Sequence, residues 1–374
     1  MKRNLIALAV AGVFLAPAAA MADGSGIVLT GLVHGDIGFG YEKCESDCDG
    51  EGGSNIAYKR QANIGTFATR WEIDGTEDLG WAQAIFGLAM DQKFAGAGAG
   101  STTSTRGGGQ NNNNNNVGDL NNRNSFLGLT GGFGTIKIGQ NEHLYEIQQI
   151  LQDPDPASEN TFSTLSLMTS WGGVHPGFTR RDPQSIWYAS PNIGGATIEA
   201  AYITPAGRKN RSVSPQGVQL GANWKSAFGL SLYGALAQYN DEDGFKNKNR
   251  AIRVGAGFGT ELFQVDVFTE ALKFTADGGV SDKRNNFGVS GALNFGQHHI
   301  RGALSLAGKL KTASGTVSDS SARMLLIGYA YTLSKRTELQ VNYGMVDNKK
   351  NASFNVGANG NDANRLGVGI RHTF

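Results

Sequence analysis

The side chains that most often bind metals or transfer protons are few in this sequence and widely spaced. Its histidines are His34, His143, His175, His298, His299 and His372. His298 and His299 are the only adjacent pair, and neighbouring residues of a β-strand point to opposite faces. Because a zinc ion needs three or four ligands, we interpret this pair as the edge of a turn and predict no metal site.

Motifs for covalent or metal-assisted catalysis are missing as well. The chain contains no G-x-S-x-G nucleophile, no H-E-x-x-H motif and no glycine-rich phosphate loop ahead of a helix. An enzyme needs an acid and a base in one cluster, and no segment supplies such a pair. We therefore predict a protein that is not an enzyme and uses no cofactor.

The two cysteines lie close together in an acidic segment. Cys44 and Cys48 are separated by three residues within the run from Glu42 to Glu51. In an oxidising compartment this spacing favours a disulfide within a loop. A metal site is the alternative, and the absence of histidines nearby makes it the weaker interpretation.

The N-terminal segment predicts export from the cytoplasm. Lys2 and Arg3 precede the apolar run from Leu5 to Ala16, and Ala20-Met21-Ala22 matches a signal-peptidase site. We expect a signal peptide at 1–22 and one mature domain at 23–374. The mature chain then carries 31 basic and 32 acidic residues, so its charge does not favour nucleic-acid binding.

The rest of the chain alternates between polar and apolar residues without a domain boundary. One example is Val265 and Val267, which alternate with Gln264 and Asp266. Such alternation sends one set of side chains to each face of a strand. No later segment has the roughly 18 continuous apolar residues of a membrane-spanning helix. The polar faces carry many charges, and a dry core does not accept unpaired ions, so we expect those faces to be wet.

The alternating segments number sixteen, and tight and long connections alternate between them. The tight connections lie near Leu79, Gly132, Ile193, Ala227, Thr260, Gln297 and Lys335. The long ones span about 42–62, 95–122, 141–179, 205–216, 241–249, 276–284, 311–321 and 347–363. Short turns on one rim and long loops on the other are typical of a 16-stranded antiparallel transmembrane β-barrel, with short periplasmic turns and long extracellular loops.

An even number of strands brings both ends of the barrel to the short-turn rim. The final segment, Asn364 to Phe374, can then pair with the first, at about Gly26 to Tyr41. This pairing removes the edges of the sheet, whose unpaired backbone groups a bilayer does not tolerate.

Three stretches of the sequence resemble the general trimeric porins of Gram-negative bacteria. The first runs from Gly75 to Gly80 and continues into Ala84-Ile85-Phe86. The second, from Arg123 to Gly139, is R-x-x-F-L-G-L-T-G-G-F-G-T-I-K-I-G. The third runs from Arg181 to Asn192. Together with the N-terminal segment, the sixteen segments and the terminal Phe374, the resemblance covers essentially the whole chain.

The resemblance implies a homotrimer in which each subunit has its own pore, narrowed by a third loop that folds inward. Here that loop is the segment 141–179, the longest connection. In the family, acidic residues on this loop face arginines on the barrel wall. The implied constriction residues are Arg70, Arg123 and Arg181 on the wall, and Glu142, Glu146, Asp153, Asp155 and Glu159 on the loop.

The predicted function is passive diffusion of small hydrophilic solutes and ions across the bacterial outer membrane. The expected contacts are outer-membrane lipid and lipopolysaccharide. A substrate-selective channel is the main alternative, but it needs a ladder of like charges or aromatic residues, and the lumen residues are of mixed sign. An outer-membrane enzyme or adhesin is a further alternative.

Overall fold

The structure is a computed structural model, and it describes residues 25–44, 59–66, 69–92, 120–142, 145, 167–178, 180–204, 214–242, 245–356 and 359–374. The strands are β1 (Gly26–Cys44), β2 (Lys59–Gly65), β3 (Arg70–Asp78), β4 (Gln83–Gln92), β5 (Leu120–Gly131), β6 (Gly134–Glu142), β7 (Arg181–Ala189), β8 (Ala196–Ile203), β9 (Gln216–Lys225), β10 (Leu230–Asn240), β11 (Asn247–Gly259), β12 (Phe263–Ala276), β13 (Ser281–Phe295), β14 (His298–Ala307), β15 (Lys311–Thr312), β16 (Gly315–Thr316), β17 (Ala322–Ser334), β18 (Thr337–Asn348) and β19 (Asn361–Thr373).

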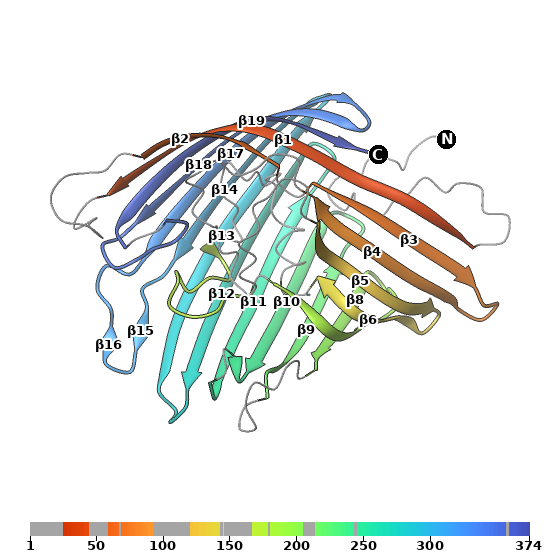
Figure 1. The fold of residues 1–374 in the computed structure, drawn as a ribbon, viewed down its shortest axis with the longest axis horizontal. Coiled ribbons are helices and arrows are strands. Elements are labelled where there is room, and N and C mark those ends of the chain that lie inside the picture. The colour runs from red at the N-terminus through yellow and green to blue at the C-terminus, as the bar shows by residue number, and fades with distance from the viewer. Residues whose placement is uncertain are drawn as a thin grey trace.

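All of these strands belong to one antiparallel sheet that closes on itself. The first and last strands, β1 and β19, pair from Leu32 opposite Thr373 to Cys44 opposite Asn361. Figure 1 shows them side by side, β1 in red and β19 in dark blue. The predicted closure is confirmed, because the first and last strands are hydrogen-bonded to each other.

The described part of the sheet contains sixteen barrel strands, as the sequence predicts. Two segments, β2 and β3, pair in line along the same strand β1, through Asp36 opposite Gly65 and Leu32 opposite Arg70. They count as one strand of the barrel. A small hairpin, β15 and β16, lies within the connection from β14 to β17, which pair directly with each other.

The distribution of side chains between the two faces is the reverse of that in a soluble sandwich. On β12, Val265 and Val267 are 46% and 41% exposed, whereas Asp266 and Glu270 are 1% exposed. Such alternation recurs around the barrel, and apolar residues form a continuous outer belt. A lipid bilayer stabilises this arrangement, because it accepts apolar side chains outside while the interior holds the polar ones. None of the described residues forms a helix long and apolar enough to cross a membrane.

The short turns lie where the sequence predicts, but the sixth long loop was predicted wrongly. Four residues, 277–280, join β12 to β13. The two strands continue almost to the turn, where the amide of Ala276 donates to the carbonyl of Val280 at 2.9 Å. Gly278 and Gly279 have φ angles of 88° and 86°, which glycine adopts without strain. The segment's polar composition resembles that of a long loop, and these two glycines permit a tight turn instead.

Two predictions concern residues outside the described ranges. The signal peptide at 1–22 is one of them. The disulfide is the other, because Cys44 ends β1 but Cys48 is not among the described residues. Both remain predictions.

Candidate functional site

The three predicted wall arginines lie close together on the inner face of strands β3 to β7. Arg70 forms an ion pair with Glu72. Arg123 contacts Asp91 of β4 at 2.8 Å, between Nη1 and Oδ1. Arg70 also lies within electrostatic range of both Arg123 and Asp91. These contacts link charged side chains of the three neighbouring strands β3, β4 and β5.

The carboxylate of Glu142 lies between Arg181 and Arg123 and contacts both guanidinium groups. Its Oε1 atom is 2.6 Å from Arg181 Nη2 and 3.7 Å from Arg123 Nη2. Three guanidinium groups and three carboxylates therefore lie together, and their formal charges balance. We call this set the arginine cluster: Arg70, Arg123, Arg181, Glu72, Asp91 and Glu142.

Strand irregularities lie beside the arginine cluster. The β4–β5 register shifts between Leu88 and Met90, and the β6–β7 register shifts between Gly139 and Asn141. Gly139 has a φ of 133°, and a side chain there would meet the Ser125 carbonyl oxygen at 2.2 Å. Bulges of this kind redirect the residues that follow them. The glycine that ends the second resemblance motif thus permits the bend that precedes Glu142.

The structure changes the predicted position of one acid. The third connection was expected to begin at residue 141, but β6 continues to Glu142, which pairs directly opposite Arg181 of β7. Glu142 is therefore a wall residue at the end of a strand. The other predicted acids, Glu146, Asp153, Asp155 and Glu159, lie outside the described residues. Glu72 and Asp91 were not predicted as site residues, although Glu72 is two positions from Arg70 and must share its face.

The described parts of the third connection, here called loop 3 (143–180), are packed inside the barrel. Five of its apolar and aromatic side chains have no exposed surface: Tyr145, Leu167, Met168, Trp171 and Phe178. Leu167 and Met168 join an apolar cluster with inward residues of β10, β12, β14, β17, β18 and β19. Tyr145, Trp171 and Phe178 join a second cluster with residues of β8, β10, β11 and β12. The inward fold of loop 3 thus has apolar anchors on the wall.

A buried polar network reinforces these anchors. Glu270 of β12 and Arg253 of β11 form an ion pair of 2.6 Å whose side chains are 0% exposed. The Tyr145 hydroxyl donates to Glu270 at 2.6 Å, and the Thr169 amide donates to the same carboxylate at 2.8 Å. Asn286 of β13 donates to it at 2.9 Å. These bonds compensate the removal of both charges from water, which is otherwise costly. This part of the polar face is dry, contrary to our expectation, because loop 3 covers it.

The second half of loop 3 is held by aromatic and polar contacts. Trp171 donates from Nε1 to Asn249 at 3.3 Å, and Asn249 donates to the Pro176 carbonyl at 2.8 Å. The His175 ring stacks on Phe274 with centroids 3.8 Å apart, and its Nε2 is 2.8 Å from Asp282. Burial lowers the pKa of His175, and the Asp282 carboxylate offsets part of that effect.

The end of loop 3 is fixed by one arginine. Arg180 pairs with Glu242, and its Nε is 3.3 Å from Asp182. Its guanidinium lies over the ring of Tyr239, 3.2 Å from the centroid. The Tyr239 hydroxyl in turn donates to Asp182 at 3.0 Å. Arg180, and not only the predicted Arg181, is therefore a structural element of this region.

The adjacent histidines His298 and His299 contact different residues. His298 stacks on Phe295 and hydrogen-bonds the Tyr329 hydroxyl, whereas His299 contacts Asn294 and Thr332. Within the described ranges, no group of three His, Cys, Asp or Glu side chains is arranged to hold a metal ion.

Comparisons with known proteins agree with this geometry. The model of the Gram-negative porin family matches residues 7–351. The major outer membrane protein P.IB of Neisseria meningitidis serogroup A is 24% identical over 386 residues, and the outer membrane porin protein 32 of Delftia acidovorans is 25% identical over 388 residues. Each alignment covers 100% of both chains.

Solved structures show the same fold. An anion-selective porin from Comamonas acidovorans superposes with a TM-score of 0.70 at 22% identity, over 94% of this chain and 100% of that one. A trimer form of OmpT from Vibrio cholerae gives a TM-score of 0.65 at 13% identity, over 94% and 100%. With a family match over most of its length, this chain belongs to the Gram-negative porins, the outer-membrane channels for passive diffusion.

Proposed function

We propose that the channel is narrowest where loop 3 faces the arginine cluster, and that this gap passes small hydrophilic solutes and ions. The observation that supports this proposal is the order of the strands around the barrel. The arginine cluster lies on β3 to β7, whereas the Arg253–Glu270 network that holds loop 3 lies on β11 to β13. In a closed sheet of sixteen strands these two groups lie on opposite walls. Loop 3 thus reaches from one wall to the other.

A constriction of this kind acts through charge as well as width. Charges of opposite sign on two sides of a narrow gap create a transverse field, which orients dipolar solutes and disfavours apolar ones. The arginine cluster is balanced in charge, so a small change there alters the sign of the local field. We propose Glu146, Asp153, Asp155 and Glu159 as the acids that face it from loop 3.

Replacement of Arg70, Arg123 and Arg181 by Gln tests the proposal. It leaves three carboxylates without cations, so the reversal potential in a salt gradient across a planar bilayer should shift toward cations. Replacement of the same residues by Lys retains the charge and should leave the sign of selectivity unchanged. Arg336→Gln, at an exposed short turn, is the matched control. An unshifted reversal potential in the Gln variant would show that the arginine cluster does not line the narrowest point.

We further propose a homotrimer in contact with outer-membrane lipid and lipopolysaccharide. The trimer form of OmpT supports this assembly, because its fold is similar. Electrophoresis in sodium dodecyl sulfate without heating should retain a trimer band, and conductance steps should arrive in groups of three. A monomer band with single steps would contradict the trimer. Steps blocked by one class of solute would favour a substrate-selective channel instead.

A further inference from the structure

Three charged side chains on the channel wall make no polar contact with the described part of the protein. Asp74 lies on β3, Lys137 on β6 and Glu199 on β8. Within the described ranges, none of the three side chains forms a hydrogen bond or an ion pair, although Lys137 lies within electrostatic range of both carboxylates. In the arginine cluster, by contrast, each guanidinium group contacts a carboxylate. These three charges can therefore be satisfied by a solute.

All three charges face the interior of the barrel. Ile136 and Ile198, their neighbours in sequence, are 42% and 62% exposed on the outer belt. Because adjacent residues of a strand point to opposite faces, Lys137 and Glu199 face inward. Asp74 lies two positions after the glutamate of the arginine cluster on β3, so it shares the inner face of that strand.

Two aromatic rings flank the ammonium group of Lys137. Its Nζ atom is 4.1 Å from the ring centroid of Phe126 on β5 and 5.0 Å from that of Trp187 on β7. Trp187 is directly opposite Lys137 in the register of β6 and β7. The face of an aromatic ring attracts a cation but offers no carboxylate or carbonyl oxygen. The rings thus position the ammonium group, and its N–H groups can still donate to an anion.

A glycine makes room for one ring and one carboxylate. A side chain at Gly87 of β4 would meet the ring of Phe126 at 2.6 Å and Oδ1 of Asp74 at 2.9 Å. The ring and the carboxylate therefore lie side by side over this glycine.

The second ring has a carboxylate beside it as well. Ala201 of β8 is directly opposite Trp187, and Glu199 lies two positions before Ala201. Glu199 is thus a diagonal neighbour of Trp187 on the same face. Because β6 lies between the strands of the two ring–carboxylate pairs, the cation lies between two such pairs. We call this set the periplasmic subsite: Asp74, Phe126, Lys137, Trp187 and Glu199.

The periplasmic subsite lies between the arginine cluster and the short-turn rim. Asp74 is four residues after Arg70 on β3, and Trp187 is six residues after Arg181 on β7. In both strands this direction leads to a short turn. At about 3.3 Å per residue, the subsite is roughly 13–20 Å from those arginines along the strands. A solute that enters from outside and passes the arginine cluster therefore meets this subsite next.

We propose that the periplasmic subsite binds small zwitterions with an aromatic body, such as aromatic amino acids. The carboxylate of the solute contacts Lys137, its ammonium group contacts Glu199, and its ring packs on Trp187. Such charge-assisted hydrogen bonds are stronger than neutral ones. Lys137 and Glu199 form no ion pair with each other, so one zwitterion can bridge them, whereas a solute of single charge satisfies only one. This inference rests on the proposed diffusion pathway and adds a class of solute to it.

Phenylalanine and three compounds that each lack one of its groups test the proposal. 3-Phenylpropanoate lacks the ammonium group, phenethylamine lacks the carboxylate and glycine lacks the ring. Each compound is added to full-length channels in a planar bilayer, in about 0.1 M salt because higher salt screens charge. The measured quantity is the concentration that gives half of the maximal reduction in current. In the parent channel, phenylalanine should act at the lowest concentration.

Each variant removes one contact and should affect a different set of compounds. Lys137→Gln should weaken the block by phenylalanine and by 3-phenylpropanoate about tenfold, and should not weaken the block by phenethylamine. Glu199→Gln should weaken the block by phenylalanine and by phenethylamine about tenfold, and should not weaken the block by 3-phenylpropanoate. Trp187→Leu should weaken the block by all three ring compounds about fivefold and leave glycine unaffected. Lys137→Arg retains a cation between the rings and should retain most of the block.

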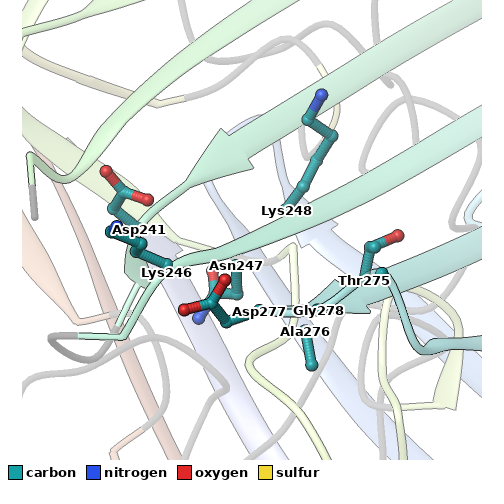
Figure 2. Close-up of a pocket in the computed structure, with 9 residues that line it drawn as sticks. Asp241, Lys246, Asn247, Lys248, Thr275, Ala276, Asp277 and Gly278 are labelled. Atoms are coloured by element: carbon teal, nitrogen blue, oxygen red, sulfur yellow. The ribbon is translucent and has the colours of Figure 1, made fainter.

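The matched control is Lys248→Gln at the long-loop rim. Lys248 is an exposed residue that lines a hollow of this rim with Asp241 and Asp277, and Figure 2 shows it pointing away from both carboxylates. This variant should match the parent with all four compounds.

Two results would overturn the proposal: an equal phenylalanine block in the parent and in Lys137→Gln, or a glycine block as strong as that of phenylalanine. Heat-dependent mobility in sodium dodecyl sulfate shows whether each variant forms the barrel. If Lys137→Gln does not, Glu199→Gln decides, and its phenylalanine block must then be weaker than that of the parent. Failure of the proposed constriction is a separate result, because the reversal potential of the arginine variants is measured without phenylalanine.

Discussion

The hydroxyl of Tyr145 donates a hydrogen bond of 2.6 Å to the carboxylate of Glu270, although the two residues are 125 positions apart. Tyr145 belongs to the start of loop 3 and Glu270 to the inner face of β12. Tyr145 is 0% exposed and Glu270 is 1% exposed. This contact attaches loop 3 to the wall opposite the arginine cluster, so the proposed constriction would depend on it.

Loss of this contact should loosen loop 3 without unfolding the barrel. Tyr145→Phe removes one hydrogen bond to a charged group, which is worth about 1.5–3 kcal/mol. Single-channel recordings should then show more frequent current fluctuations. Tyr343→Phe is the control, because its hydroxyl contacts Asn364 at the exposed outer surface. Equally quiet recordings from both variants would contradict a role of Tyr145 in holding the loop.

Glu270→Gln should have a larger effect than Tyr145→Phe. Removal of one partner from a buried ion pair costs about 3–5 kcal/mol, because Arg253 remains as an uncompensated charge. We expect a lower unfolding temperature, measured by heat-dependent mobility in sodium dodecyl sulfate. The double variant Glu270→Gln/Arg253→Met should recover part of the loss. If the double variant is no more stable than Glu270→Gln, the buried charge does not explain the effect.

Neutralisation of Glu142 should shift ion selectivity in the direction opposite to loss of the arginines. Glu142 contacts both Arg123 and Arg181, so Glu142→Gln leaves the arginine cluster with an excess positive charge. The reversal potential should move toward anions. Glu77→Gln, at an exposed position near the β3–β4 turn, is the control and should leave it unchanged. A shift toward cations would be incompatible with this assignment.

Truncation of the buried tryptophan should widen the pore. Trp171 is fully buried in the second apolar cluster, and a Trp→Ala change in a core costs about 3–5 kcal/mol. Trp171 packs loop 3 against the wall, so the loss of this packing should weaken the attachment of loop 3. Polymers that the parent channel excludes should then enter the Trp171→Ala channel. Trp81→Ala, at the exposed turn after β3, should leave polymer exclusion unchanged. An unaltered size limit in Trp171→Ala would show that this anchor does not set the width.

The attachment of loop 3 should weaken in acid through His175. Burial lowers its pKa below the ordinary value of about 6.5, so the docked loop favours the neutral ring. A released loop restores the ordinary pKa. The contribution of His175 to docking is therefore complete above about pH 6.5 and is lost as the pH falls through the lower pKa of the docked state.

Protease cleavage of loop 3 as a function of pH measures this effect. Cleavage should rise as the pH falls below about 6.5 in the parent, and the rise should be smaller in His175→Gln. The charged groups that face His175 are Asp282 and Arg284, so Asp282→Asn serves to separate their contribution. His372→Gln, at the end of β19, is the matched control. Identical profiles for the parent and His175→Gln would exclude His175 as the acid-sensitive group.

Sequence patterns alone determined the barrel of this protein. The alternation of Val265 and Val267 with Asp266 is a local property of a strand, and turn residues such as those near Leu79 and Gly132 are local as well. Strand number, closure through β1 and β19, and the facing of most side chains follow from these features. The arginine cluster was found in part, because Arg123 and Arg181 begin two of the resemblance motifs and Arg70 lies shortly before the remaining one.

The tertiary structure decided which distant residues meet. Alternation places Glu270 on the inner face, but it does not reveal that Tyr145 and Thr169 cover that residue and exclude water from it. Nor does it show that Glu142 ends a strand between two arginines, since a bulge at Gly139 and the register of β6 against β7 set that position. The opposition of Lys273 and Lys283 on neighbouring strands likewise exists only through the register of β12 against β13. Register and loop docking depend on contacts between segments far apart in the chain, and a local pattern carries no record of them.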